Sequence, residues 1–261
     1  MRVRFRPAFL WELKDHFYGG FIGGLEYVWN FEELADSLKI YNGEEDILLL
    51  EDHLMGLRTG LGLSMVWDSR DYLLNSTTGS FMYLNALFFG PYVGSEYRYS
   101  SFLLDARKYL NPVSNHAIAL RGLINYRFTS DDSLPLRGLS KVGGNSFVRG
   151  YFEGTYQDSH VAAFETEYRI PFWKEDNIAP FHKFWKRLGA TVFFSGAQVY
   201  GQNDAFHLDA FNFAAGGGLR ILFNEESRAN LRIDYAFGLS QNSAGPGKKQ
   251  TGLYFFLGEA F

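Results

Sequence analysis

The residues suited to catalysis or metal binding are few and scattered along the chain. The six histidines show no His-x-x-Glu or other catalytic spacing and no spacing of metal ligands; they are His16, His53, His116, His160, His182 and His207. His53 beside Asp52 is the one candidate base that we single out, and a solvated loop explains this pair more simply. The absence of cysteine excludes a thiolate nucleophile, a thiolate metal site and a disulfide scaffold. The sequence therefore predicts a protein that is not an enzyme and that holds no metal and no cofactor.

Charged side chains form a second chemical pattern, because they recur on one face of segments whose other face is apolar. Between Leu231 and Leu239, apolar residues at odd positions alternate with Arg232 and Asp234. The same face of other segments carries further charges of both signs, namely Arg58, Arg107, Arg121, Arg127, Arg169 and Arg220 with Asp105, Glu165 and Glu167. The chemistry that this pattern offers is ion pairing.

Composition narrows the class of protein. Aromatic residues make up 18% of the chain and there are 28 glycines, which is too apolar for a disordered protein. The net charge of −4 gives no basic footprint for nucleic acid. The longest uncharged stretch, 72–95, is interrupted by Asn, Gly and Pro and does not qualify as a transmembrane helix. The basic start at 1–7 lacks the apolar core of a signal peptide, so an export signal, if there is one, is missing from this numbering.

Alternation with a period of two residues dominates the whole sequence and predicts strands. We count eleven candidate strands, near 2–13, 19–30, 57–67, 80–90, 97–110, 116–128, 161–172, 187–195, 211–223, 231–239 and 252–261. A twelfth strand in Asp46–Leu54 would give the even number that is usual for single-chain bacterial barrels.

Such alternation fits a soluble sandwich or lipocalin-like barrel, and equally a membrane barrel whose apolar face points outward. Three features favour the membrane barrel. The strands are about 10–13 residues long, as a tilted membrane-crossing strand requires. Their polar faces mix charges with Gly and Ala, and aromatic residues such as Tyr27, Trp29 and Tyr200 cluster at strand ends. We therefore expect an all-β fold, a transmembrane antiparallel up-and-down β-barrel of about 12 strands.

The connections alternate in length, as outer-membrane barrels require. The short connections, at 14–18, 111–114 and 224–227, are expected at the periplasmic end. The long connections, at 31–56, 129–159 and 240–250, are expected to face outward. The connection 171–186 is long although it falls on the short side, and both an interfacial helix and a packed loop remain open for it.

Several motifs together resemble the bacterial surface antigen superfamily, the BamA/TamA-type outer-membrane assembly and translocation barrels. Val148-Arg149-Gly150-Tyr151 is similar to the family's Val-Arg-Gly-aromatic signature in a loop that folds inward, here 129–159. Asp68-Ser69-Arg70-Asp71 followed by Gly79 resembles the family's periplasmic turn. The last strands and the terminal aromatic, Phe261, also resemble the family, in which that aromatic is recognised during barrel insertion.

The resemblance implies that Arg149 locks the loop inside the barrel. An unpaired guanidinium there would be costly, so we expect it to meet an inward carboxylate. The family usually supplies an Asp from a Phe-Phe-Asp-Ala-Gly segment, but Ser195 stands at this position. Glu167 and Asp234 become the expected partners, with Glu165 as a further candidate. A second interpretation, that Arg149 merely staples the loop without any functional part, stays open.

Two departures from the family are apparent. Its members normally carry periplasmic POTRA modules, whereas strands begin here at residue 3, so we expect 1–261 to form a single barrel domain without a POTRA domain. The family barrel usually has about sixteen strands. We therefore expect a POTRA-less branch with a shorter barrel, and the small strand number suggests a homodimer.

The function implied by the resemblance is the insertion or translocation of polypeptides at the outer membrane of a Gram-negative bacterium. The expected partners are the lipid bilayer with its lipopolysaccharide and unfolded outer-membrane protein clients. Family barrels have a weakly paired seam between the first and last strands, and Gly252 and Gly258 would weaken the last strand here. The alternative is a passive or plugged pore, or a structural accessory barrel, because a mixed-sign lumen favours closure over conduction.

Overall fold

A computed structural model describes residues 2–29, 56–113, 116–129, 139–145, 147–171, 187–224, 226–240, 250–259 and 261. The described chain is almost entirely β-strand. The strands are β1 (Arg2–Phe5), β2 (Ala8–Lys14), β3 (Phe17–Val28), β4 (Gly56–Asp68), β5 (Gly79–Phe89), β6 (Tyr99–Leu110), β7 (Ala117–Thr129), β8 (Ser140–Val142), β9 (Tyr156–Asp158), β10 (His160–Pro171), β11 (Leu188–Tyr200), β12 (Asn212–Asn224), β13 (Ala229–Gly238) and β14 (Thr251–Leu257). Two short 3-10 helices, η1 (Pro91–Val93) and η5 (Leu208–Ala210), lie in connections.

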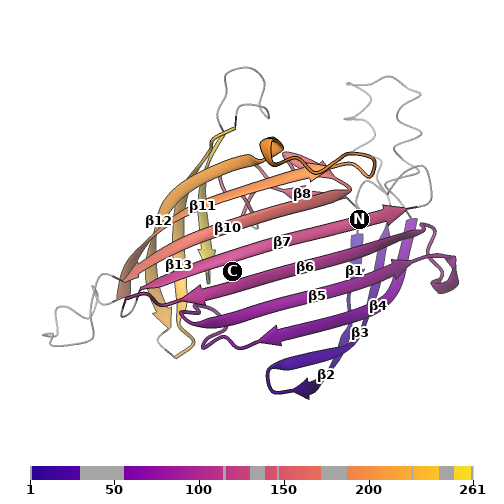
Figure 1. Ribbon diagram of the computed structural model, residues 1–261, viewed down its shortest axis with the longest axis horizontal. Coiled ribbons are helices and arrows are strands. Elements are labelled where there is room, and N and C mark those ends of the chain that lie inside the picture. Colours follow the sequence, from indigo (N-terminus) through magenta and orange to yellow (C-terminus); the bar gives the residue numbers. More distant parts are fainter. Residues whose placement is uncertain are drawn as a thin grey trace, which may run out of the picture.

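The large sheet is antiparallel and joins sequence neighbours in the order β1-β3-β4-β5-β6-β7-β10-β11-β12-β13-β14, with β2 also paired to β3. It curls so that its two ends turn behind the strands between them (Figure 1). β1 and β2 lie end to end along the same edge of β3, because Pro7 has no N–H for the ladder and interrupts a single strand. The eleven strand positions predicted from the sequence are therefore confirmed, and the suggested twelfth strand at Asp46–Leu54 lies outside the described residues.

The two faces of the sheet differ as a membrane barrel requires. Outward apolar side chains are exposed, such as Leu219 at 52% and Val192 at 55%, whereas the neighbouring Arg220 and Thr191 are only 4% and 2% exposed. A soluble barrel would bury the apolar face instead. The predicted membrane-barrel class is confirmed, and the charged face lines the lumen. No helix among the described residues is long and apolar enough to cross a membrane.

The loop between β7 and β10 folds into the lumen, as expected. Its described parts form the β8–β9 hairpin and a tight segment at 147–152. Val142, Phe147, Val148 and Tyr151 are buried there against small residues of β10, β11 and β12. An apolar cluster inside a polar lumen anchors the loop independently of its charges.

The chain turns inward after β14, which the alternation did not predict. Gly258 has a φ of +101°, in the left-handed region that favours glycine. The turn carries Glu259 to hydrogen bonds with Arg220 Nε at 2.8 Å and Asn230 Nδ2 at 2.6 Å. Phe261 is buried beside Tyr109, and its carbonyl accepts a hydrogen bond from Arg169. The alternation of the last strand, with Leu253, Phe255 and Leu257 outward, predicts Glu259 and Phe261 on the same outward face, and the inward turn makes this prediction wrong.

Candidate functional site

The backbone of the loop places Arg149 at the centre of the lumen. Val148 has a φ of +55° and Gly150 a φ of +115°, so the arginine sits on a sharp double bend. A Cβ at Gly150 would lie 2.6 Å from the carbonyl carbon of Phe237 in β13. Glycine is required here both by the conformation and by this close approach.

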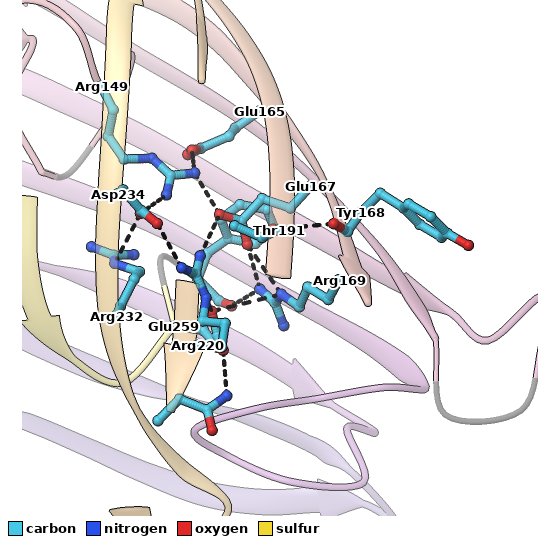
Figure 2. Close-up of polar contacts among 12 residues, drawn as sticks. Arg149, Glu165, Glu167, Tyr168, Arg169, Thr191, Arg220, Arg232, Asp234 and Glu259 are labelled. Atoms are coloured by element: carbon cyan, nitrogen blue, oxygen red, sulfur yellow. Dashed lines mark hydrogen bonds and ion pairs between the residues drawn. The ribbon is translucent and has the colours of Figure 1, made fainter. Parts of the chain in front are cut away.

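Arg149 is the hub of a buried ion-pair network (Figure 2). Its guanidinium is fully buried and donates hydrogen bonds to Glu165, Glu167 and Asp234. The first two carboxylates come from β10 and the third from β13. The structure thus brings together all three carboxylates that the sequence offered as partners, rather than selecting between them.

Four further charged groups extend this network toward the end of the barrel where β12 turns into β13. Arg169 binds Glu167 with its Nη2 at 2.9 Å, and Arg220 binds Asp234 with its Nη1 at 2.6 Å. Glu259 pairs with Arg220 at 2.8 Å, and Arg232 Nε lies 3.3 Å from Asp234. Four arginines thus face four carboxylates, and the formal charge of the network is balanced. A buried cluster of this kind is costly to disrupt one partner at a time.

An aromatic ring supports the hub. The Arg149 guanidinium lies 3.6 Å from the ring centroid of Phe193 on β11, a cation–π contact. Ser195, two residues along, is fully buried, and its Oγ has no hydrogen-bond partner among the described residues. The Asp expected by family resemblance is therefore replaced by a hydroxyl outside the network. Phe193 faces inward like its neighbours Thr191 and Ser195 on β11, but its contact with Arg149 depends on how the loop folds.

Tyrosine side chains tie the loop to the last strands. The Tyr151 hydroxyl donates to the carbonyl of Phe213 at 2.8 Å and accepts from the Ser240 N–H at 2.9 Å. The Gly150 N–H donates to the hydroxyl of Tyr254 on β14 at 2.9 Å. Sequence reasoning missed Tyr254, and no local signal marked it. The motif residues therefore contact the final strand as well as the centre of the lumen.

The turn between β4 and β5 is organised by its own charged residues. Arg70 Nη2 binds Asp68 Oδ2 at 2.7 Å, and the Asp71 carboxylate accepts the N–H groups of Thr77 and Thr78 at 2.9 and 3.2 Å. Gly79, with a φ of +100°, passes so close to Ser69 that a Cβ would meet its carbonyl oxygen at 2.2 Å. The motif residues of this turn act locally and do not contact the Arg149 network in the described structure.

Hydrogen bonds also set the acidity of Asp71. Burial by itself raises the pKa of the carboxyl, but hydrogen bonds from the side chain and N–H of Thr77 and from neighbouring N–H groups outweigh it. The pKa of Asp71 therefore lies below its ordinary value.

The two glycines expected to soften the seam lie in and beside β14. A Cβ at Gly252 would lie 2.5 Å from the hydroxyl oxygen and 2.6 Å from ring carbons of Tyr254, so Gly252 makes room for the tyrosine that binds the loop. Gly258 produces the inward turn. Neither β14 nor β1/β2 has a second strand neighbour in the described sheet. We call these two edges, β1/β2 and β14, the seam.

The site holds opposite charges close together inside the barrel. Its arginines and carboxylates balance one another in formal charge, and among the described residues no group of three or more His, Asp or Glu could hold a metal ion. The arrangement is suited to fixing a loop in the lumen and joining it to the edge of the sheet. His53 and Asp52 lie outside the described residues.

Comparisons with known proteins agree with this geometry. The Omp85 superfamily domain matches residues 23–261. The fold is similar to BamA from Haemophilus ducreyi lacking POTRA domains 1–3, with a TM-score of 0.68 and 14% identity, over 98% of this chain and 54% of that one. It is also similar to CdiB from Acinetobacter baumannii, with a TM-score of 0.57 and 14% identity, over 98% and 41%. No curated protein gives a significant match. The chain spans about half the length of these structures, and the resemblance inferred from its motifs is confirmed.

Proposed function

Because this chain belongs to the Omp85 superfamily, we propose that it inserts or translocates polypeptides at the outer membrane of a Gram-negative bacterium. It is an outer-membrane β-barrel, and its outward apolar face is the surface that contacts lipid. The substrate of the proposed activity is an unfolded polypeptide with strands of its own, such as an outer-membrane protein client.

The observation that carries this proposal is the seam, whose two edges have no second strand neighbour in the described sheet. Edge strands present unpaired N–H and C=O groups, which form a template for another strand. β14 pairs with β13 over only seven residues before Gly258 turns the chain inward. In the hydrocarbon region unpaired backbone groups are costly, so an incoming strand would be stabilised there.

The contacts of the loop with β14 suggest how the site takes part. The hydroxyl of Tyr254 accepts a hydrogen bond from the Gly150 N–H, while Arg149 of the same segment forms ion pairs with Glu167 on β10 and Asp234 on β13. The loop therefore braces the strand at the edge where a client would pair. In this proposal the network keeps the edge in register for the client and does not itself react.

A folding assay tests the activity. The protein is reconstituted in liposomes, a urea-unfolded model barrel is added, and its folded fraction is followed by heat-modifiable migration on a gel. We expect the client to fold faster than in protein-free liposomes. Equal rates in both would contradict the proposed activity.

Cross-linking tests the seam separately, because the chain has no cysteine of its own. A client with one cysteine in its last strand is added to the L253C variant, which carries a cysteine on β14. The control is V192C on β11, an interior strand, where the native side chain is similarly exposed at 55% against 58% for Leu253. We expect a disulfide with L253C and not with V192C; equal yields would refute capture at the seam.

A plugged structural barrel is the alternative that one observation favours. The loop packs an apolar cluster into the lumen and its arginine is paired with carboxylates there, so the loop fills part of the interior. A barrel that migrates heat-modifiably, conducts no ions in planar bilayers and leaves client folding unchanged would establish this second function.

A further inference from the structure

A second charged region lies in the lumen, away from the Arg149 network. It is a cavity of about 320 Å³. It lies at the end of the barrel where β3 and β5 finish and where β4 and β6 begin. Five basic residues line it, contributed by β1 and the residues just after it, by β4, by β7 and by the folded-in loop: Arg4, Arg6, Arg58, Arg127 and Lys141. Among the described residues, Glu26 and Glu153 are the carboxylates that line it.

The basic charge of this cavity is not neutralised by the described residues around it. Glu26 is shared between Arg4 at 3.3 Å and Arg58 at 2.9 Å, so one carboxylate serves two guanidiniums. Arg127 donates to the hydroxyl of Ser140 at 2.8 Å and has no ion pair with any carboxylate in the described part of the chain. The Arg149 network, by contrast, matches each arginine with a carboxylate. The cavity therefore has an excess of positive charge in a confined space, which an anion would stabilise.

We propose that this cavity binds a phosphate monoester group. Guanidinium forks match phosphate oxygens in two-point hydrogen bonds, and this is why arginine prevails in phosphate sites. Asn125, which also lines the cavity, supplies a neutral donor through its amide N–H groups, while its Oδ1 accepts from the Ser101 hydroxyl at 3.3 Å. The volume is at the small end of ligand pockets, so it holds the phosphate with a small substituent.

Two sources could present this group. A soluble phosphate ester would enter from the lumen. A phosphorylated lipid headgroup would enter through the seam, because Arg4 lies on β1, an edge strand without a second neighbour in the described sheet. The proposal does not depend on the insertase activity, since it concerns only the charge of the cavity.

The register of the sheet provides a sharp variant. Ser101 on β6 is the direct cross-strand partner of Arg127 on β7. Side chains directly opposite in an antiparallel pair are close enough to interact. The Ser101→Asp variant therefore offers Arg127 an internal carboxylate in place of the ligand.

The experiment is calorimetric titration of the detergent-solubilised protein at low salt. Inorganic phosphate and glucose 1-phosphate test the soluble source, and phosphorylated lipid A, compared with its dephosphorylated form, tests the lipid source. The variants are Arg127→Gln and Ser101→Asp. The control is Arg98→Gln, because Arg98 is exposed at the same end of β6 and does not line the cavity.

We expect saturable binding in at least one arm, weakened about tenfold or more in Arg127→Gln and abolished in Ser101→Asp, with Arg98→Gln unchanged. Ser101→Asp should also migrate as a folded barrel to a higher temperature, since it pairs a lone arginine. Binding only of phosphorylated lipid identifies the lipid source, and binding of the soluble esters identifies the lumen. Absence of binding in every arm, or equal affinity in Arg127→Gln and Arg98→Gln, overturns the proposal.

Discussion

Replacing Arg149 by methionine removes the charge at the hub while keeping a long side chain. The three carboxylates it contacts are then affected differently. Glu167 keeps Arg169 at 2.9 Å, and Asp234 keeps Arg220 at 2.6 Å. Glu165 loses the one ion pair that it makes with described residues. The substitution therefore strands one buried carboxylate, not three.

The cost can be estimated from this count. Removing one partner of a buried ion pair costs about 3–5 kcal/mol. Since two of the three carboxylates keep an arginine, we expect the lower end, about 3 kcal/mol. The loop is also held by its apolar cluster and by Tyr151, so the loss should appear as local opening of the loop. At 1.4 kcal/mol for each factor of ten, the open population rises roughly 150-fold.

Hydrogen exchange measures this opening directly. The Gly144 N–H donates to the carbonyl of Tyr151 at 2.7 Å and the Gly150 N–H to Tyr254, so both amides report the docked loop. We expect exchange in peptides covering 143–152 to accelerate by about the same factor in Arg149→Met, while heat-modifiable migration shows that the barrel persists.

Two further variants decide the reasoning. Adding Glu165→Gln to Arg149→Met removes the stranded charge, so the double variant should exchange more slowly than the single one. Arg98→Met, at an exposed position, should leave exchange in the loop unchanged. If hydrogen exchange in the loop accelerates less than tenfold in Arg149→Met, or no more than it does in Arg98→Met, the view that the ion pairs hold the loop in place is refuted.

Three other outcomes follow from the geometry. Gly150→Ala should lower the temperature at which the barrel loses its heat-modifiable band, because a strained φ costs about 1–3 kcal/mol. Gly122→Ala should leave this temperature unchanged, because a Cβ there meets nothing within 4 Å. Equal temperatures for the two variants on gels would contradict the close approach of Gly150 to β13. Because the pKa of Asp71 is lowered by folding, its stabilisation of the turn is complete above its unfolded pKa of about 3.9 and is lost as the pH falls through its folded pKa. Exchange at the Thr77 amide should therefore speed up, beyond its intrinsic pH dependence, as the pH falls below about 4 in the wild type, and it should show no such step in Asp71→Asn. Identical profiles would argue against this carboxylate. Ser195→Ala should leave thermal stability the same or slightly higher, because it removes a buried hydroxyl without a partner among the described residues; a clear loss in the melting curve would show that the hydroxyl is satisfied.

The sequence by itself determined the fold class and the facing of its strands. Alternation is a local property with a period of two residues, so Leu219 and Arg220 are assigned to opposite faces without knowledge of any other strand. Long strands with charges on the inner face then indicate a membrane barrel. The same alternation put Glu165, Glu167 and Asp234 in the lumen as candidate partners of Arg149.

Only the tertiary structure decided what these inward groups contact. That Arg149 meets three carboxylates depends on a loop bent at Val148 and Gly150 and on the register of β10 against its neighbours, neither of which alternation specifies. The inward turn at Gly258 moved Glu259 and Phe261 from the outer face to the lumen, because one positive φ overrides the alternation after it. The pairing of Ser101 with Arg127 is likewise a matter of register between two strands. A period along one chain fixes the face of a residue, whereas its partner is fixed by where separate segments meet in space.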